Sequence, residues 1–542
     1  MHSPADPFAT AMLVHGDTVA WVGSDDAAAG HAPQADEVVG LAGALVTPAF
    51  VDAHAHLTET GLALTGVDLT GVRSVAEVLR LVEQAGRKAG GRPVLGHGWD
   101  ERLLAEGRPP TRPELDRAAY GGVVYLSRVD VHSAVVSSAL AAAARLRDLD
   151  GWSDDGRVER DAHHAARTAT RDGITDGTRR ALQESALTAA ARAGIGAVHE
   201  MSAPHIAPER DLSALVELVE QRRDASDAPA LPDVVAYRGQ LVSTAKEASD
   251  VIGRLGLPTG LPAGSRLHGL AGDLCVDGSI GSRTAALRSP YADAPGTSGH
   301  LYLDAEQIAA HVVACTEAGL QAGFHVIGDA ALDVVLRGFT DAAERVGEAA
   351  LRRRRHRLEH VEMVDAEAIA ALARLGVHAS VQPVFDALWG GASGLYAERL
   401  GPGRAAGMNP FAALAAAGVP LALGSDSPVT PFDPWGAVAA CVFHTAESQR
   451  TSARAGFTAH TRGAWRAAGY DDRGVLVPGA PATYAVWSAA DLVVQAPDDR
   501  IQAWSTDPRS GTPGLPDLSP GVHRPTCLRT VVRGRVAHDV LR

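Results

Sequence analysis

The chain has 542 residues, of which 46% are hydrophobic and 21% charged, a composition that is typical of a folded protein larger than one ordinary domain and that disfavours disorder. The formal net charge of −14 argues against a nucleic-acid partner, because phosphate binding requires clustered Lys and Arg. The four cysteines are far apart and form no CxxC pair, which argues against a disulfide framework and a thiolate zinc site.

Short strand-like segments are predicted at both ends of the chain. They are Ala11–Val14 and Val19–Gly23 near the beginning, and Ala482–Trp487 and Leu528–Val532 near the end. Neither end has enough apolar residues for a core of its own. We therefore expect residues 1–48 and 470–542 to form one small β-sandwich together.

Between these ends, apolar strand-like segments alternate with Ala-rich helical stretches, a pattern typical of a parallel β/α array. The predicted strands are Gly43–His54, Val94–Gly98, Val123–Arg128, Ile195–Glu200, Val234–Tyr237, Leu267–Asp277, Ala322–Ile327, His356–His360, Val377–Gln382 and Pro420–Ser425. The helical stretches that separate them include Val75–Lys88, Ser185–Ala193, Ala305–Ala318 and Ala366–Leu375.

An eight-stranded barrel does not need ten strands, so two of the predicted strands belong to an insertion. Residues 65–190 are the expected place, because that stretch is too long for one βα connection. The fold prediction is an α/β protein with a (β/α)8 TIM-like barrel over residues 49–469.

The most informative motif is the pair of histidines at the end of the first predicted barrel strand. His54 and His56 are separated by one residue, and residues i and i+2 of a strand point to the same side. Two converging neutral imidazoles form half of a transition-metal site. The motif alone is weak, because an ordinary buried polar pair has the same spacing.

Three further polar residues stand at the ends of later predicted strands. They are His325, His360 and Asp426. Active sites of β/α barrels lie at the C-terminal ends of the strands. Four imidazoles and one carboxylate in barrel order therefore predict a metal centre.

These motifs together resemble the metal-dependent amidohydrolase superfamily, in the YtcJ-like branch that includes N-substituted formamide deformylases. The segments that carry the resemblance span nearly the whole chain: Pro48–His56, Gly98–Asp100, Arg128–His132, Asp277–Thr284, Phe324–Asp329, Arg357–His360 and Gly424–Val429. The resemblance implies a (β/α)8 barrel with a flanking β-sandwich and one or two divalent cations, usually zinc. It assigns His54, His56, His325, His360 and Asp426 to the metal centre.

The chemistry of C–N bond hydrolysis requires these residue types independently of the resemblance. Bound Zn²⁺ lowers the pKa of its water to about 7, and a carboxylate beside that water can take its proton and return it to the leaving nitrogen. We expect Asp426 to be that carboxylate. The metal or a nearby imidazole polarises the scissile carbonyl, and we place His360 with Asp426 in the catalytic group.

One position departs from the pattern of the resemblance. Relatives commonly carry a lysine four residues before the Asp-Gly-Ser motif, which becomes carbamylated and bridges two metals. Here Asp273 occupies that position, and its side chain is too short to reach as far. Three outcomes are open: Asp273 binds a metal after local backbone adjustment, the site holds one metal, or another group bridges.

The resemblance also places several residues near the substrate. We expect His97, Trp99, Asp100, His132, Asp277 and Arg283 to line the pocket. The Arg283 guanidinium could bind a substrate carboxylate or carbonyl as a planar fork, or it could hold Asp277 in a structural ion pair.

The expected function is hydrolysis of an amide, formamide or cyclic amide by a metal-activated water. One alternative is a deaminase of an aminated ring on the same barrel. Another is a catalytically impaired amidohydrolase-like binding protein. No membrane partner is expected, since no export signal or uncharged apolar stretch of spanning length is visible. We expect a cytoplasmic enzyme with a small-molecule substrate, and a homodimer is the ordinary expectation.

Overall fold

The computed structural model describes residues 1–225, 227–257, 266–489, 492–493 and 514–541. Its centre is a sheet of eight parallel strands. In spatial order these are β4 (Phe50–Ala55), β10 (Ile195–Ser202), β11 (Asp233–Arg238), β12 (Arg266–Leu270), β13 (Gln321–Val326), β14 (Arg357–His360), β15 (His378–Val381) and β16 (Leu421–Leu423).

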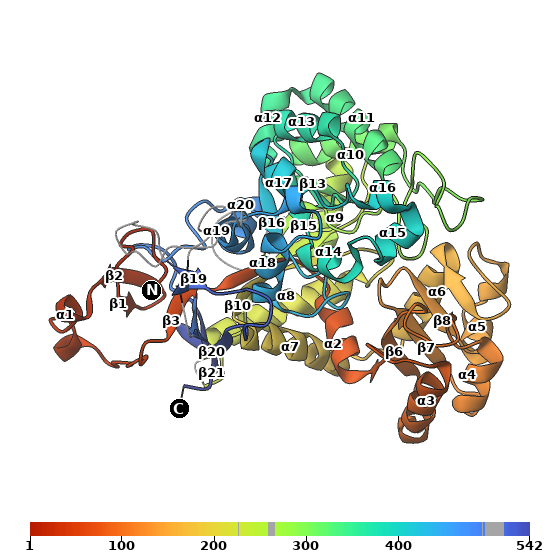
Figure 1. Ribbon diagram of the computed structural model, residues 1–542, viewed down its shortest axis with the longest axis horizontal. Helices are drawn as coiled ribbons and strands as arrows, with labels where there is room; N and C mark the ends of the chain where they lie inside the picture. Colours follow the sequence, from red (N-terminus) through yellow and green to blue (C-terminus); the bar gives the residue numbers. More distant parts are fainter. Residues whose placement is uncertain (226, 258–265, 490–491, 494–513, 542) are drawn as a thin grey trace.

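The sheet closes on itself where β16 meets β4. Ala55 and Ser427 form a parallel bridge, and the Asp426 N–H donates to the carbonyl oxygen of His54 at 2.7 Å. Helices cover the outside of the closed sheet (Figure 1). The prediction of a (β/α)8 barrel is confirmed, and α10 (Ala305–Ala318) and α13 (Ala366–Leu375) have the predicted bounds.

The barrel strands are buried on both faces, which is the reason that they read as nearly continuous apolar runs. Every residue of β10 and β13 is buried. The largest apolar cluster joins the barrel wall to the surrounding helices, with Phe324 of β13 packed against Phe339 of α11 (Asp329–Val346).

A second sheet lies between β4 and β10 in the sequence, at the right of Figure 1. Its five strands are β5 (Val67–Asp68), β6 (Val94–Trp99), β7 (Val124–Arg128), β8 (Ser133–Val136) and β9 (Arg157–Glu159). Helix α6 (Arg160–Arg171) ties this part to the barrel, because Arg171 forms an ion pair with Glu59 of α2 (Leu57–Thr65). The predicted strands Val94–Gly98 and Val123–Arg128 are thus β6 and β7, outside the barrel.

The chain ends lie side by side at the left of Figure 1. Strands β3 (Leu45–Pro48), β17 (Tyr484–Ser488), β20 (Thr526–Val532) and β21 (Arg535–Asp539) form an antiparallel sheet, and β1 (Ala11–His15) and β2 (Thr18–Gly23) form a separate hairpin. Val19, Val46 and Val486 share a small core between them. Residues 490–491 and 494–513 of the predicted sandwich lie outside the described residues. Among the described helices, none is long and apolar enough to cross a membrane.

The fourth barrel strand is shorter than predicted. β12 ends at Leu270, whereas the apolar pattern predicted a strand through Asp277. The chain turns at Gly272, where φ is +92°, a conformation that favours glycine. It pairs with β13 again at Cys275 through an isolated bridge to His325. This turn decides where Asp273 points.

Candidate metal centre and active site

Six acidic and imidazole side chains meet where the barrel strands end: His54, His56, Asp273, His325, His360 and Asp426. The Asp273 carboxylate lies among the histidines, with Oδ2 3.1 Å from His56 Nε2 and Oδ1 3.4 Å from His54 Nε2. The same Oδ1 lies 3.6 Å from His325 Nδ1 and 3.9 Å from His360 Nε2. Asp426 Oδ1 lies 3.4 Å from His54 Nε2 and 3.3 Å from His56 Nε2.

Hydrogen bonds at the far side of two rings fix which nitrogen faces the centre. Glu359 lies 2.8 Å from His54 Nδ1 and is held in turn by Arg357. Gln382 Oε1 lies 2.9 Å from His360 Nδ1. Both rings therefore present Nε2 to the centre, the arrangement that metal-ligating histidines commonly have.

Several of the atoms that face the centre have no hydrogen-bond partner among the described residues. His54 Nε2, His360 Nε2, His325 Nδ1 and Asp273 Oδ1 are buried without a hydrogen bond among the described residues. Buried polar atoms ordinarily have partners. Two groups of three residues each have ligand atoms that all lie within 4.8 Å of one another inside the group. The groups are His54–Asp273–His360 and His54–His56–Asp426. Nitrogen and carboxylate oxygen donors in this number fit a divalent cation such as zinc.

Burial and charge act against each other at these groups. Burial favours the neutral ring, but Asp273 and Asp426 outweigh it and raise the pKa of His360 to about 9 and that of His56 well above its usual value. Burial likewise favours protonated carboxyl groups, yet the histidines lower the pKa of Asp273 and of Asp426. Both carboxylates are therefore ionised near neutral pH and attract a cation.

The backbone at two of these residues is unusual. His360 has a φ of +73° and Asp426 a φ of +55°, values that side-chain-bearing residues adopt rarely. Asp52 holds the end of β16 in place, since its Oδ1 accepts the N–H of Ser425 at 3.0 Å. Such strained positions concentrate at functional sites.

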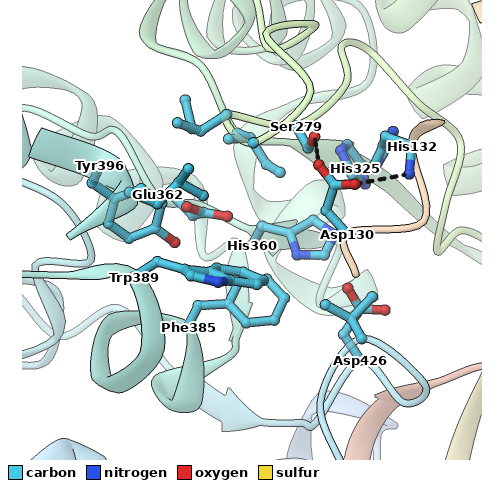
Figure 2. A pocket seen from close by; sticks show the side chains of 15 residues that line it. Asp130, His132, Ser279, His325, His360, Glu362, Phe385, Trp389, Tyr396 and Asp426 are labelled. Carbon is cyan, nitrogen blue, oxygen red and sulfur yellow. Dashed lines mark hydrogen bonds between the residues drawn. The ribbon is translucent and has the colours of Figure 1, made fainter. Parts of the chain in front are cut away.

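A cavity of about 370 Å³ opens beside His325, His360 and Asp426. Figure 2 shows aromatic side chains forming one wall and Asp130 with His132 on the opposite side. The aromatic wall is Phe385 and Trp389 of α14 (Pro383–Trp389) with Tyr396 of α15 (Leu395–Leu400). We call this space the aromatic cavity.

A second cavity, of about 520 Å³, opens on the side of His56 and Asp273. It is lined mainly by polar side chains: Glu59, His132, His163, His164, Arg167, His205, Cys275 and Tyr302. His132 borders both spaces, because it also lines the aromatic cavity. We call the second space the histidine cavity.

The structure separates the predicted pocket residues into two groups. His132 lines both cavities, and His97 lines a third space beside Glu59 and Arg171, with its Nε2 2.9 Å from the carbonyl oxygen of Pro428. Trp99, Asp100, Asp277 and Arg283 line none of these three spaces.

Side chains of the second group have other partners. Trp99 Nε1 donates to Leu126 in the core of the inserted sheet. Asp277 accepts backbone N–H groups of Ile327 and Gly328, and Arg283 pairs with Asp293 at 2.6 Å, not with Asp277. These contacts position the loops around the site.

Several cavity residues were not predicted from the sequence. Glu362 is 2% exposed, lines the aromatic cavity and keeps Oε2 without a hydrogen bond among the described residues. Arg167 and His205 line the histidine cavity from α6 and from the loop after β10. Glu362 could have been found from its place two residues after His360. Arg167 gives no such signal, because it lies outside the barrel strands.

Similarity to known proteins shows the family of this chain. Residues 37–538 match the amidohydrolase family, and the chain belongs to it. It is 26% identical over 417 residues to the YtcJ protein of Bacillus subtilis (strain 168), with 74% of each chain covered. It is 27% identical over 476 residues to the N-substituted formamide deformylase of Arthrobacter pascens, with 80% of each covered. An uncharacterized metal-dependent hydrolase from Pyrococcus furiosus has a similar structure, with a TM-score of 0.68, 30% identity and coverage of 88% of this chain and 94% of that one.

Proposed function

We propose that this protein is a metal-dependent hydrolase that cleaves a C–N bond of an amide, formamide or cyclic amide. The observation that supports this most strongly is the set of inward-facing atoms of His54, Asp273, His325 and His360 that have no hydrogen bond among the described residues. Family membership supports hydrolysis, and the similarity to a formamide deformylase supports the kind of bond.

His54, His56, Asp273, His325, His360 and Asp426 are the proposed ligands. A divalent cation bound there would act as a Lewis acid and would make water a nucleophile near neutral pH. Asp273 is proposed to substitute for the lysine carbamate that the resemblance implies at this position. One of its oxygens faces His56, and the other faces His325 and His360. The ligand atoms form two sets that share His54, so one or two ions are compatible with the arrangement.

Asp426 is the proposed proton shuttle. Its pKa is lowered despite burial because His54, His56 and His360 surround it, so it is ionised and able to accept a proton at neutral pH. It borders the aromatic cavity, where the leaving nitrogen of a bound substrate can take that proton back.

His132 is the candidate that orients the scissile carbonyl. Burial and the neighbouring His325 lower the pKa of His132 to about 3, so its ring is neutral and can donate one hydrogen bond. It borders both cavities. A donor there would stabilise negative charge on the carbonyl oxygen.

The test is a screen of N-formyl, N-acyl and cyclic amides on protein of known metal content. We expect release of an amine and a carboxylate, with activity that rises with metal occupancy. Release of ammonia from an aminated ring would favour the deaminase alternative instead. Metal-loaded protein that turns over none of these substrates would support the impaired binding protein.

A further inference from the structure

Arg167 is a buried cation that faces the histidine cavity. Its side chain is 6% exposed and lines that cavity with His56, His132 and Asp273. One guanidinium nitrogen, Nη2, donates to the carbonyl oxygen of Val131 at 2.7 Å. Its Nε has no partner, and no carboxylate lies within 4.0 Å of the guanidinium, among the described residues.

Most of the other buried arginines that the structure describes have the acid partner that Arg167 lacks. A guanidinium that is removed from water ordinarily gains a carboxylate partner, because the loss of hydration is otherwise uncompensated. Arg128, Arg357 and Arg399 all have such partners at 2.6–3.0 Å. Arg238 and Arg473 have none among the described residues. Arg238 Nη1 donates to Ser202 and Ala207, the Arg473 guanidinium lies over the Tyr470 ring, and neither arginine lines the two cavities.

The acids nearest in the cavity wall are already engaged. Glu59 accepts two hydrogen bonds from Arg171, and Asp273 faces the histidines of the candidate metal centre. The other polar groups of the cavity wall include His163, His164 and His205, which offer hydrogen bonds but no negative charge. The cavity thus has a fixed positive charge and space for an anion beside it.

We propose that Arg167 binds a carboxylate of the substrate in the histidine cavity. This rests on the proposed function, because the scissile bond then lies at the candidate metal centre between the two cavities. The apolar part of the substrate extends along Phe385 and Trp389 in the aromatic cavity. The substrate class is therefore an N-acyl or cyclic amide that carries a carboxylate on one side and an apolar group on the other.

Arg283 gives a matched control. Two roles were open for it from the sequence, binding of a substrate carboxylate or carbonyl and a structural ion pair with Asp277. In the structure its guanidinium pairs with Asp293, and it lines neither cavity. Replacing either arginine by methionine removes the same charge and leaves a side chain of similar length. Only the replacement of Arg167 should affect an anionic ligand.

The experiment measures binding of phenylbutyrate and of its neutral analogue phenylbutanol by calorimetry to metal-analysed, full-length protein. Neither ligand has a C–N bond, so binding is measured without turnover. We expect wild type to bind phenylbutyrate more tightly than phenylbutanol. We expect Arg167→Met to weaken phenylbutyrate binding by about tenfold to a hundredfold, the usual effect of losing a charged hydrogen-bonding partner.

Phenylbutanol binding should be the same in wild type and in Arg167→Met, which shows that the cavity is retained. Arg283→Met should bind both ligands like wild type. Unchanged phenylbutyrate affinity in Arg167→Met would overturn the proposal, because it would mean that the carboxylate binds the metal alone. An equal loss in Arg283→Met would overturn it as well.

Arg167→Lys keeps the charge without the planar fork, and it decides the outcome if the methionine variant does not fold. An intermediate phenylbutyrate affinity is expected, and wild-type affinity would contradict recognition by the guanidinium. Protein that shows this dependence on Arg167 but hydrolyses no amide would contradict the proposed hydrolysis alone. Protein that hydrolyses neutral amides and binds phenylbutyrate independently of Arg167 would contradict only the carboxylate subsite.

Discussion

Asp426 and Asp273 face the same imidazoles, yet we expect them to have different roles in the reaction. Asp426 Oδ1 lies near two histidines, whereas the two oxygens of Asp273 together lie within 4.0 Å of four histidines. Replacing Asp426 should therefore affect turnover most strongly, and replacing Asp273 should affect metal binding.

Asp426→Asn should lower kcat by about a hundredfold or more while metal remains bound, because an amide cannot accept the proton from the attacking water. Steady-state kinetics together with elemental analysis of the same preparation check this. Turnover close to that of wild type would rule out Asp426 as the base.

Asp273→Ala should reduce metal content, because it removes the carboxylate that lies within 4.0 Å of four histidines. Elemental analysis after dialysis measures the change, and Asp293→Ala is a control outside both cavities. Full occupancy in the Asp273 variant would show that this residue supports the ligands without binding the ion.

The turn after β12 determines whether an aspartate can replace a longer side chain. Gly272 has a φ of +92°, and a Cβ there would lie 2.9 Å from Met201 Sδ. The chain leaves the strand at this point, and Asp273 is carried toward the histidines.

Gly272→Ala should destabilise the fold by about 1–3 kcal/mol, the cost of a sparsely populated backbone conformation, and should lower metal content by displacing Asp273. Gly253→Ala in α9 (Ala245–Leu255), where a Cβ meets nothing within 4 Å, should be neutral or slightly stabilising. Urea unfolding and metal analysis test both. Equal behaviour of the two variants would contradict the role of the turn.

The barrel strands and the turn at Gly272 explain which residues of this site could be predicted from the sequence. His54, His56, His325, His360 and Asp426 were predictable, because barrel strands deliver their terminal residues to one end regardless of loop detail. The position of Asp273 was not, since strand parity predicts a continuous β12 and the turn at Gly272 breaks it.

Arg167 was not predictable for another reason. It lies on α6, beyond the inserted sheet, and its place over the barrel depends on tertiary contacts such as the ion pair of Arg171 with Glu59. The apolar pattern of the sequence predicts strands of the insertion, but it does not predict how the insertion packs on the barrel. The barrel could therefore be predicted more fully than the cavity above it.

Stability of the whole protein should fall as the pH is lowered from about 6.5, because neutral histidines are buried in the core. Burial lowers the pKa of His311 to about 4 from an ordinary value of 6.5. Its two nitrogens contact the N–H of Val242 and the carbonyl of Leu270. As the pH is lowered, His311 of the unfolded chain takes up a proton before His311 of the folded protein does. The contribution of the neutral ring to the free energy of unfolding is therefore full above pH 6.5 and is lost as the pH falls toward about 4.

The loss from His311 alone amounts to about 3 kcal/mol. His311→Asn should therefore show a shallower decline of unfolding free energy across this range than wild type, as measured by urea unfolding at several pH values. Identical pH dependence in the two proteins would mean that the ring is protonated in the fold.

The central claim is that the barrel histidines and aspartates hold a catalytic divalent cation. The most direct measurement is the metal content of the purified full-length protein, followed by hydrolysis of an N-formyl amide before and after chelation. We predict at least stoichiometric divalent metal, loss of hydrolysis on chelation and its return on adding zinc. Protein without bound metal, whose hydrolysis neither chelation nor zinc changes, would contradict the account.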